Sequence, residues 1–178
     1  MKPLRGKTEA RALRAADAAR YPEGAALTFL MQDWEDGYNV GGLLRLADGL
    51  GACELFASGS TPVPPHPMIG VTSLGHHRRI PIHHHRRHED AARAALEAGY
   101  SLVALEIAEG AQNYLEFAFP RRVCIAVGNE AKGLYKGVLS HCSGAVMIPM
   151  YGKGRSLNVV VSAGIVGYQA VASWRQQI

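Results

Sequence analysis

The chain has no apolar run that approaches the roughly eighteen residues of a membrane-spanning helix. Its N-terminal segment, MKPLRGKTEARALRAADAAR, is basic but lacks the apolar core of a secretory signal. Its Arg-rich and Ala-rich character resembles an organelle transit peptide, but Glu9 and Asp17 argue against that interpretation. We therefore expect residues 1–24 to be a short N-terminal extension containing an amphipathic surface helix.

Cysteine is scarce. The three cysteines, Cys53, Cys124 and Cys142, are widely spaced, and no CxxC pair occurs. Disulfide-rich secreted folds and Cys-based zinc sites need more cysteines at closer spacing, so neither is expected. Free thiols in a reducing cytoplasm explain this usage best.

Three common catalytic and nucleotide-binding signatures are also missing. The sequence contains no GxGxxG, no GxxxxGK[ST] and no GxSxG segment. These absences argue against an ordinary dinucleotide-binding dehydrogenase, a P-loop NTPase and an α/β-hydrolase. No Ser–His–Asp arrangement stands out either, because most histidines lie in one cluster.

The composition is that of an ordinary soluble domain. Hydrophobic residues make up 48% of the 178 residues and charged residues 19%, enough to build one substantial core. The formal charge of +4 and the isoelectric point near 9.1 favour a polyanionic partner. No repeat or linker divides the chain, so residues 25–178 are predicted to form a single domain.

Short apolar runs alternate with amphipathic stretches along the chain, which predicts an α/β fold with a mostly parallel sheet flanked by helices. The apolar runs are nearly continuous, as expected for strands covered on both faces. Strands are predicted at 25–31, 53–59, 79–84, 101–106, 123–128 and 145–150, helices at 39–51, 88–100 and 156–176, and a proline-stiffened loop at 61–67.

Three loops that follow predicted strands are chemically unusual. They are DGYNVGGLLR (36–45), VGNEAKGL (127–134) and IPMYGKGRSLN (148–158). Ligands of parallel sheets bind beyond the carboxyl ends of strands, and glycines there let the backbone approach a ligand closely. Ser156 is expected to cap the last helix. Each loop taken alone also fits a plain turn and helix cap.

Together and in this order, the three loops resemble the three signature motifs of the SpoU (TrmH) class of RNA ribose methyltransferases in the SPOUT superfamily. NVGGLLRLADGLG matches the first motif through Asn39 and Arg45, IAVGNEAKGL matches the second, and IPMYGKGRSLNVVVSAG matches the third. The resemblance extends from about Ala25 to the C-terminus. Two departures are Gly42, where alanine is usual, and Val160, where a hydroxyl residue is commoner.

The resemblance implies a homodimer whose sheet ends in a deep trefoil knot, with a site that draws on both subunits. It also implies methyl transfer from S-adenosylmethionine to a ribose 2′-OH of structured RNA. Transfer RNA is favoured over ribosomal RNA, since nothing resembles the extra domain common in ribosomal enzymes. By position in the motifs, five residues would line the cofactor site: Leu105, Gly128, Ile148, Ser156 and Leu157.

The resemblance casts Arg45 as the catalytic group. A guanidinium stays protonated in proteins, so we expect Arg45 to orient the 2′-oxygen or an adjacent phosphate and to stabilise developing negative charge. Four motif residues would hold Arg45 and the loops in place: Asn39, Glu130, Ser156 and Asn158. A knotted RNA-binding protein without catalytic activity and a guanine-base methylase remain as alternatives.

One feature lies outside the motifs. Residues 76–88 contain six of the eight histidines and four arginines. The four arginines, Arg78, Arg79, Arg86 and Arg87, suit contacts with RNA phosphates. A metal site is the weaker alternative, because adjacent histidines on a strand point to opposite faces and only His83 and His85 could share an ion. No metal is therefore predicted, and a merely solvated basic surface also remains open.

Overall fold

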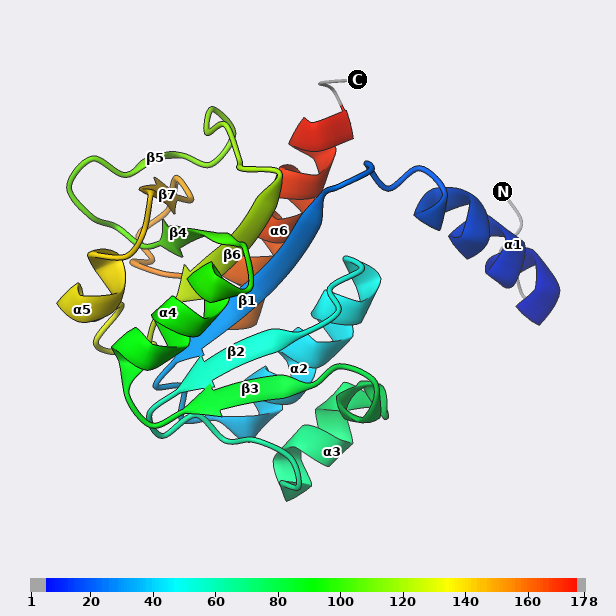
Figure 1. The fold of residues 1–178 in the computed structure, drawn as a ribbon, viewed down its shortest axis with the longest axis horizontal. Coiled ribbons are helices and arrows are strands. Elements are labelled where there is room, and N and C mark those ends of the chain that lie inside the picture. Colours follow the sequence, from blue (N-terminus) through cyan, green and yellow to red (C-terminus); the bar gives the residue numbers. More distant parts are fainter. Residues whose placement is uncertain (1–5, 176–178) are drawn as a thin grey trace.

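Seven strands, all paired in parallel, form one sheet in the order β3-β2-β1-β6-β4-β7-β5 (Figure 1). The structure is a computed structural model and describes residues 6–175. The strands are β1 Ala26–Gln32, β2 Leu55–Ser58, β3 Ile82–His85, β4 Ser101–Leu105, β5 Gln112–Asn113, β6 Arg122–Val127 and β7 Gly144–Met147.

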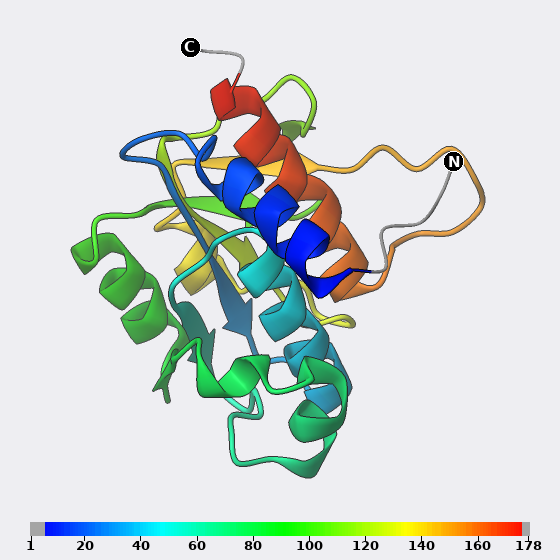
Figure 2. The same cartoon turned by 90° about the vertical axis from the view of Figure 1, so that its right-hand side faces the viewer.

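Helices cover both faces of this sheet (Figures 1 and 2). Alternate side chains of each strand point to opposite faces, so Phe29 of β1 packs with α2 and α6, while Leu30 packs with α4 and α5. The helices are α1 Lys7–Ala18, α2 Gly37–Gly49, α3 Pro67–Ser73, the 3-10 turn η1 His76–Arg78, α4 His88–Glu97, α5 Lys136–Leu139 and α6 Val159–Arg175.

The predicted sheet is therefore confirmed, including all six predicted strands. Several predicted ends were wrong. Strand β3 begins at Ile82 rather than at residue 79, and helix α4 ends at Glu97 rather than at residue 100. Strand β7 ends at Met147 rather than at residue 150, and Pro149, which has no N–H to donate, lies just beyond it. Helix α6 begins at Val159 rather than at Ser156, and Gln176, its predicted last residue, lies outside the described residues.

Four elements were not predicted: β5, α3, α5 and the three-residue turn η1. Strand β5 has two residues and α5 has four, too few for a periodic pattern. Helix α3 begins directly after the proline-rich loop, with Pro67 in its first turn, and packs closely on α2. A Cβ on Gly41 of α2 would lie 2.8 Å from the backbone carbonyl oxygen of Ile69 in α3, so this close approach requires glycine.

Helix α1 lies to one side of the sheet, and none of its residues is buried (Figure 1). It is the surface helix that was predicted for the N-terminal extension.

Helix α2 carries the first motif and begins at Gly37, two residues before Asn39. The Asp36 carboxylate caps it by accepting a hydrogen bond of 2.8 Å from the Tyr38 backbone N–H.

Candidate functional site

A cavity of about 800 Å³ opens at the carboxyl ends of β4, β6 and β7. This is the edge of a parallel sheet at which ligands are expected. The cavity brings together parts of the chain that lie far apart in sequence: 105–108, 127–134, 147–148, 150 and 155–159, with Leu139 and Ser162. All five residues predicted for the cofactor site line this cavity: Leu105, Gly128, Ile148, Ser156 and Leu157.

The loop that follows β6 closes tightly on itself. The Gly133 N–H donates to the Asn129 carbonyl oxygen over 2.8 Å, and the Asn129 side-chain oxygen accepts from the backbone N–H groups of Ala131 and Lys132. A Cβ on Gly128 would lie 2.2 Å from the backbone carbonyl carbon of Gly133. Only glycine fits there, which is the physical reason for glycine at the start of the second motif.

Two residues from other strands, which the motifs did not indicate, also bond to the backbone of this loop or of Tyr135 just after it. Gln32, buried at the end of β1, donates to the Gly133 carbonyl over 3.2 Å and accepts from the Tyr135 N–H over 2.8 Å. The Glu106 carboxylate, just after β4, accepts from the Leu134 N–H over 2.8 Å. An amide residue at the end of the mainly apolar run ALTFLMQ was the available signal for Gln32.

The three signature motifs meet through two side-chain hydrogen bonds. The Asn158 amide donates to the Asn39 side-chain oxygen over 3.0 Å, and the Asn39 amide donates to the Glu130 carboxylate over 2.8 Å. Asn158 also accepts from the backbone N–H groups of Val160 and Val161. The cap of α6 is therefore Asn158, and the expectation that Ser156 provides it was wrong.

Arg45 lies on α2 and is exposed. It is not among the residues that line the cavity, and within residues 6–175 it forms no hydrogen bond or ion pair with Asn39, Glu130, Ser156 or Asn158. Asn39, Glu130 and Asn158 connect the loops to one another rather than to Arg45, and Ser156 lines the cavity. The structure therefore leaves the guanidinium facing solvent on a helix beside the cavity residues.

A second polar cluster lies at the carboxyl ends of β1 and β2 and reaches Tyr135, just after the loop that follows β6. The Asp33 carboxylate accepts from the Ser60 N–H and hydroxyl, both over 2.9 Å, and from the Tyr135 hydroxyl over 3.1 Å. The His88 ring meets the Tyr135 ring edge-on. The hydrogen bond from the Ser60 N–H is the main reason that the pKa of Asp33 lies below its usual value, and the Ser60 and Tyr135 hydroxyls and nearby His88 add to it against a partial desolvation.

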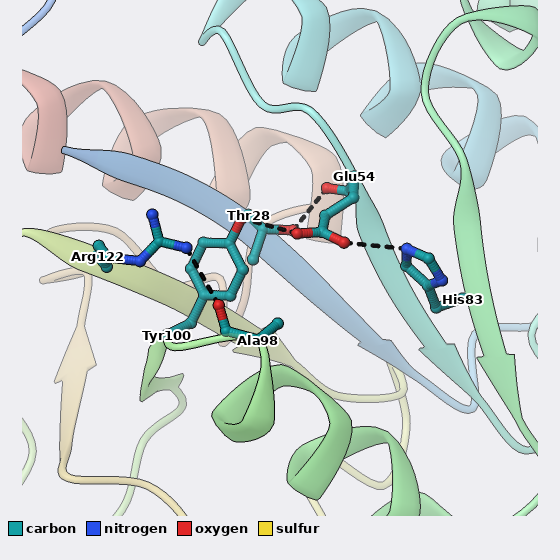
Figure 3. A network of polar contacts seen from close by, with 6 residues as sticks. All are labelled: Thr28, Glu54, His83, Ala98, Tyr100 and Arg122. Carbon is teal, nitrogen blue, oxygen red and sulfur yellow. Dashed lines mark hydrogen bonds and ion pairs between the residues drawn. The ribbon is translucent and has the colours of Figure 1, made fainter. Parts of the chain in front are cut away.

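Most histidines of the segment 76–88 are bound within the protein. Figure 3 shows His83 of β3 paired with Glu54 over 3.0 Å, where the same carboxylate accepts from the Tyr100 hydroxyl. The guanidinium of Arg122 lies over the Tyr100 ring in this network, 4.8 Å from its centre. Burial, followed by the bond to Glu54, raises the pKa of Tyr100 to about 12.

Four other histidines of this segment also have a hydrogen-bonding or ion-pair partner elsewhere in the chain. They pair as His76 with Asp48, His77 with Ser73, His84 with the Gly59 carbonyl and His88 with Ser58. The four arginines differ. All four are exposed, but Arg79 is paired with Asp48 over 3.3 Å, whereas the described residues offer no such partner to Arg78, Arg86 or Arg87. His83 and His84 thus fasten the edge strand β3, and Arg78, Arg86 and Arg87 remain exposed to solvent.

Two further observations concern residues 6–175 only. Nowhere in this part of the chain do three His, Cys, Asp or Glu side chains converge as ligands for a metal ion. None of the helices described there is long and apolar enough to cross a membrane.

Sequence and structure comparisons agree on one group of proteins. The sequence model of the SpoU rRNA methylase family matches residues 26–168. A tRNA (guanosine(18)-2′-O)-methyltransferase of Thermus thermophilus is 29% identical over 167 residues, which are 94% of this chain and 84% of that protein. A 23S rRNA (guanosine-2′-O-)-methyltransferase of Xanthomonas axonopodis is also 29% identical, but the match spans 83% of this chain and 59% of that protein.

The same group appears among solved structures. An AdoMet-bound rRNA methyltransferase from Sinorhizobium meliloti superposes with a TM-score of 0.77 at 27% identity. The superposition covers 84% of this chain and 57% of that protein. The mostly parallel sheet with its flanking helices is therefore the fold of these enzymes.

Proposed function

The chain belongs to the SpoU rRNA methylase family, and from this we propose that it is an S-adenosylmethionine-dependent RNA methyltransferase. It transfers a methyl group to a ribose 2′-OH of structured RNA. The observation that carries the proposal is the hydrogen-bonded line Asn158–Asn39–Glu130, which joins all three signature motifs at the mouth of one cavity. Transfer RNA is favoured over ribosomal RNA, because the tRNA-modifying relative is matched over most of its own length.

The cavity fits the cofactor in size and in chemistry. Its volume lies within the roughly 300–1,000 Å³ of small-molecule sites. Leu105, Ile148 and Leu157 offer apolar contacts to an adenine ring. The loop that starts at Gly128, where a Cβ would clash with the Gly133 backbone, brings backbone groups to the cavity surface. Ser156 adds a hydroxyl at the mouth. S-adenosylmethionine would supply, when bound, a methyl group on a sulfonium, which is already an activated electrophile.

The protein then has to align the ribose hydroxyl and assist the loss of its proton. We assign the alignment to Arg45, whose guanidinium holds the 2′-oxygen or a neighbouring phosphate and stabilises the negative charge that develops on the oxygen. A guanidinium stays protonated in proteins and is a poor base, so this electrostatic role suits it better than proton removal. Asn39, Glu130 and Asn158 keep the motif loops in register.

A homodimer accommodates the position of Arg45. On α2 this side chain is exposed and outside the lining of its own cavity, as expected if it serves the cavity of a second subunit. Val161 and Tyr168 of α6 are 50% and 57% exposed, and such apolar side chains are suited to a contact between copies.

Residues 25–178 would be one SPOUT domain with a trefoil knot, preceded by the extension 1–24. Three free thiols support a cytoplasmic location.

The test is incubation of the protein with labelled S-adenosylmethionine and separated RNA fractions, followed by nuclease mapping of the labelled nucleotide. We expect label in a 2′-O-methylated nucleotide of tRNA. Calorimetry with S-adenosylmethionine distinguishes the alternative of an RNA-binding protein without catalysis, because a decayed site releases no heat. Label in a base rather than a ribose would contradict the proposal.

A further inference from the structure

The segment between β7 and α6 stands away from the body of the protein (Figure 2). Residues 150–158 are all exposed, and no backbone hydrogen bond within the described chain involves residues 148–157. A Cβ on Gly152 would meet no atom within 4 Å. We call residues 150–155 the arm; its sequence is MYGKGR. The arm is open to a partner from several sides.

The chemistry of the arm is that of a surface for nucleic acid. Tyr151 is 95% exposed, the highest value among the large hydrophobic side chains of the described residues. Two cations, Lys153 and Arg155, follow it at alternate positions. No aspartate or glutamate follows Glu130 anywhere in the sequence, so the arm and α6 carry no side-chain carboxylate to neutralise these cations. An aromatic ring beside unpaired cations is how proteins hold single-stranded nucleic acid.

The arm also stands where the reacting nucleotide has to arrive. Met150 and Arg155, its two ends, line the cavity, and Asn158, just beyond it, is hydrogen-bonded to Asn39. An RNA that presents a ribose to the cavity mouth therefore passes next to the arm. Within an A-form helix the faces of a base are covered by its neighbours, so an aromatic side chain can stack only on an unpaired base.

From these observations we propose that Tyr151 stacks on an unpaired base of the RNA, at or next to the methylated nucleotide, while Lys153 and Arg155 contact the flanking phosphates. This inference rests on the proposed function and narrows its substrate to a nucleotide in a loop or another unpaired stretch. The cations favour RNA over a second copy of the chain, because a second copy would bring the same uncompensated cations to the contact.

The test measures the affinity of labelled bulk tRNA by fluorescence anisotropy, with S-adenosylhomocysteine present to prevent turnover. A fully paired RNA duplex is the control ligand. Tyr151→Ala should weaken tRNA binding about ten- to a hundred-fold, since stacking on one base contributes that much, and should leave duplex binding unchanged. Tyr151→Phe keeps the ring and should bind tRNA like the wild type.

A second variant reports the stacking directly. Trp34 and Trp174 are fully buried, so Tyr151→Trp adds the only exposed indole of the described residues. Its fluorescence should be quenched by tRNA and hardly changed by the duplex. An unchanged tRNA affinity of Tyr151→Ala overturns the inference. So does a shift in oligomeric state or a loss of S-adenosylmethionine affinity that accounts for the whole effect, because the arm would then be a contact between copies or a cofactor lid.

The two proposals fail in different ways. If the wild type transfers label to RNA but Tyr151→Ala binds tRNA normally, only the role of the arm is wrong. If Tyr151→Ala loses tRNA affinity while the wild type neither binds S-adenosylmethionine nor transfers label, the arm is an RNA site and methyl transfer is wrong.

Discussion

The side-chain amide of Asn158 donates a hydrogen bond of 3.0 Å to Asn39, a residue 119 positions earlier in the chain. Asn158 uses its other polar atom, the side-chain oxygen, to cap α6 through the backbone N–H groups of Val160 and Val161. One residue thus stabilises the start of a helix and ties the third motif to the first. The two roles use different atoms, so they can be separated by mutation.

Asn158→Asp keeps an oxygen for the cap but has no N–H to donate to Asn39. We expect its free energy of unfolding to stay near that of the wild type, because a carboxylate also suits a helix N-terminus. Asn158→Ala loses the cap and should be less stable by about 1 kcal/mol. Both variants should lose methyl transfer. Urea unfolding and label incorporation measure the two effects, and full activity of Asn158→Asp would show that the bond to Asn39 is dispensable.

Arg45→Ala should lower methyl transfer by about a hundred- to a thousand-fold, the usual effect of removing one group that stabilises developing charge. The affinity for S-adenosylmethionine should hardly change, because Arg45 is not among the residues that line the cavity. Single-turnover label transfer and calorimetry provide the two measurements. Arg45→Lys serves as the control that keeps the positive charge but lacks the planar guanidinium group and its paired N–H donors. Retained activity in Arg45→Ala would remove this residue from the mechanism.

Gly128→Ala should abolish S-adenosylmethionine binding. The added Cβ would lie 2.2 Å from the Gly133 carbonyl carbon and 2.4 Å from the Leu134 nitrogen, and backbone atoms cannot rotate away as a side chain can. Gly70→Ala is the matched control, because a Cβ there meets nothing within 4 Å. Calorimetry with the cofactor and circular dichroism of both variants decide the point. Normal binding by Gly128→Ala would mean that the loop opens easily.

Arg86→Ala combined with Arg87→Ala should weaken RNA binding and flatten its dependence on salt. The slope of log affinity against log salt is negative, and each lost phosphate contact makes it shallower by about 0.7 to 0.9. Arg79→Ala should have a smaller effect, since Asp48 already occupies that guanidinium. Binding titrations with tRNA at several salt concentrations test both expectations. An unchanged affinity and slope for the double variant would make the segment a merely solvated surface.

The ionised carboxylate of Asp33 is expected to stabilise the folded protein, and this stabilisation is expected to be lost in acid. Its pKa is lowered in the folded protein, first by the hydrogen bond from the Ser60 N–H, so the charged form is favoured there. Its contribution to the free energy of unfolding is therefore present above the unfolded pKa, near 3.8, and is lost as the pH falls through the lower folded value. Asp33→Asn should show a flatter decline below about pH 4 in urea unfolding. Parallel curves for variant and wild type would contradict this.

The sheet and the three motif loops could be predicted from the amino-acid sequence, because each is marked by residues that are close together in the sequence. Near-continuous apolar runs such as ALTFLM mark strands covered on both faces, and the glycines after them mark loops that approach a ligand. The five residues expected at the cofactor site do meet in one cavity. Parallel strands bring their carboxyl ends to the same edge, so motifs that follow strands become neighbours whatever separates them in sequence.

Only the tertiary structure determined which polar side chains bond to which partners. Sequence spacing could not show that Gln32 and Glu106 hold the loop after β6, since these bonds join separate strands. Nor could it show that Asn158 rather than Ser156 caps α6, because both residue types favour that position. For the histidines of residues 76–88, composition suggested a binding surface. Folding places a carboxylate, a hydroxyl or a carbonyl beside most of them, and only contacts in space settle which polar groups remain available to a ligand.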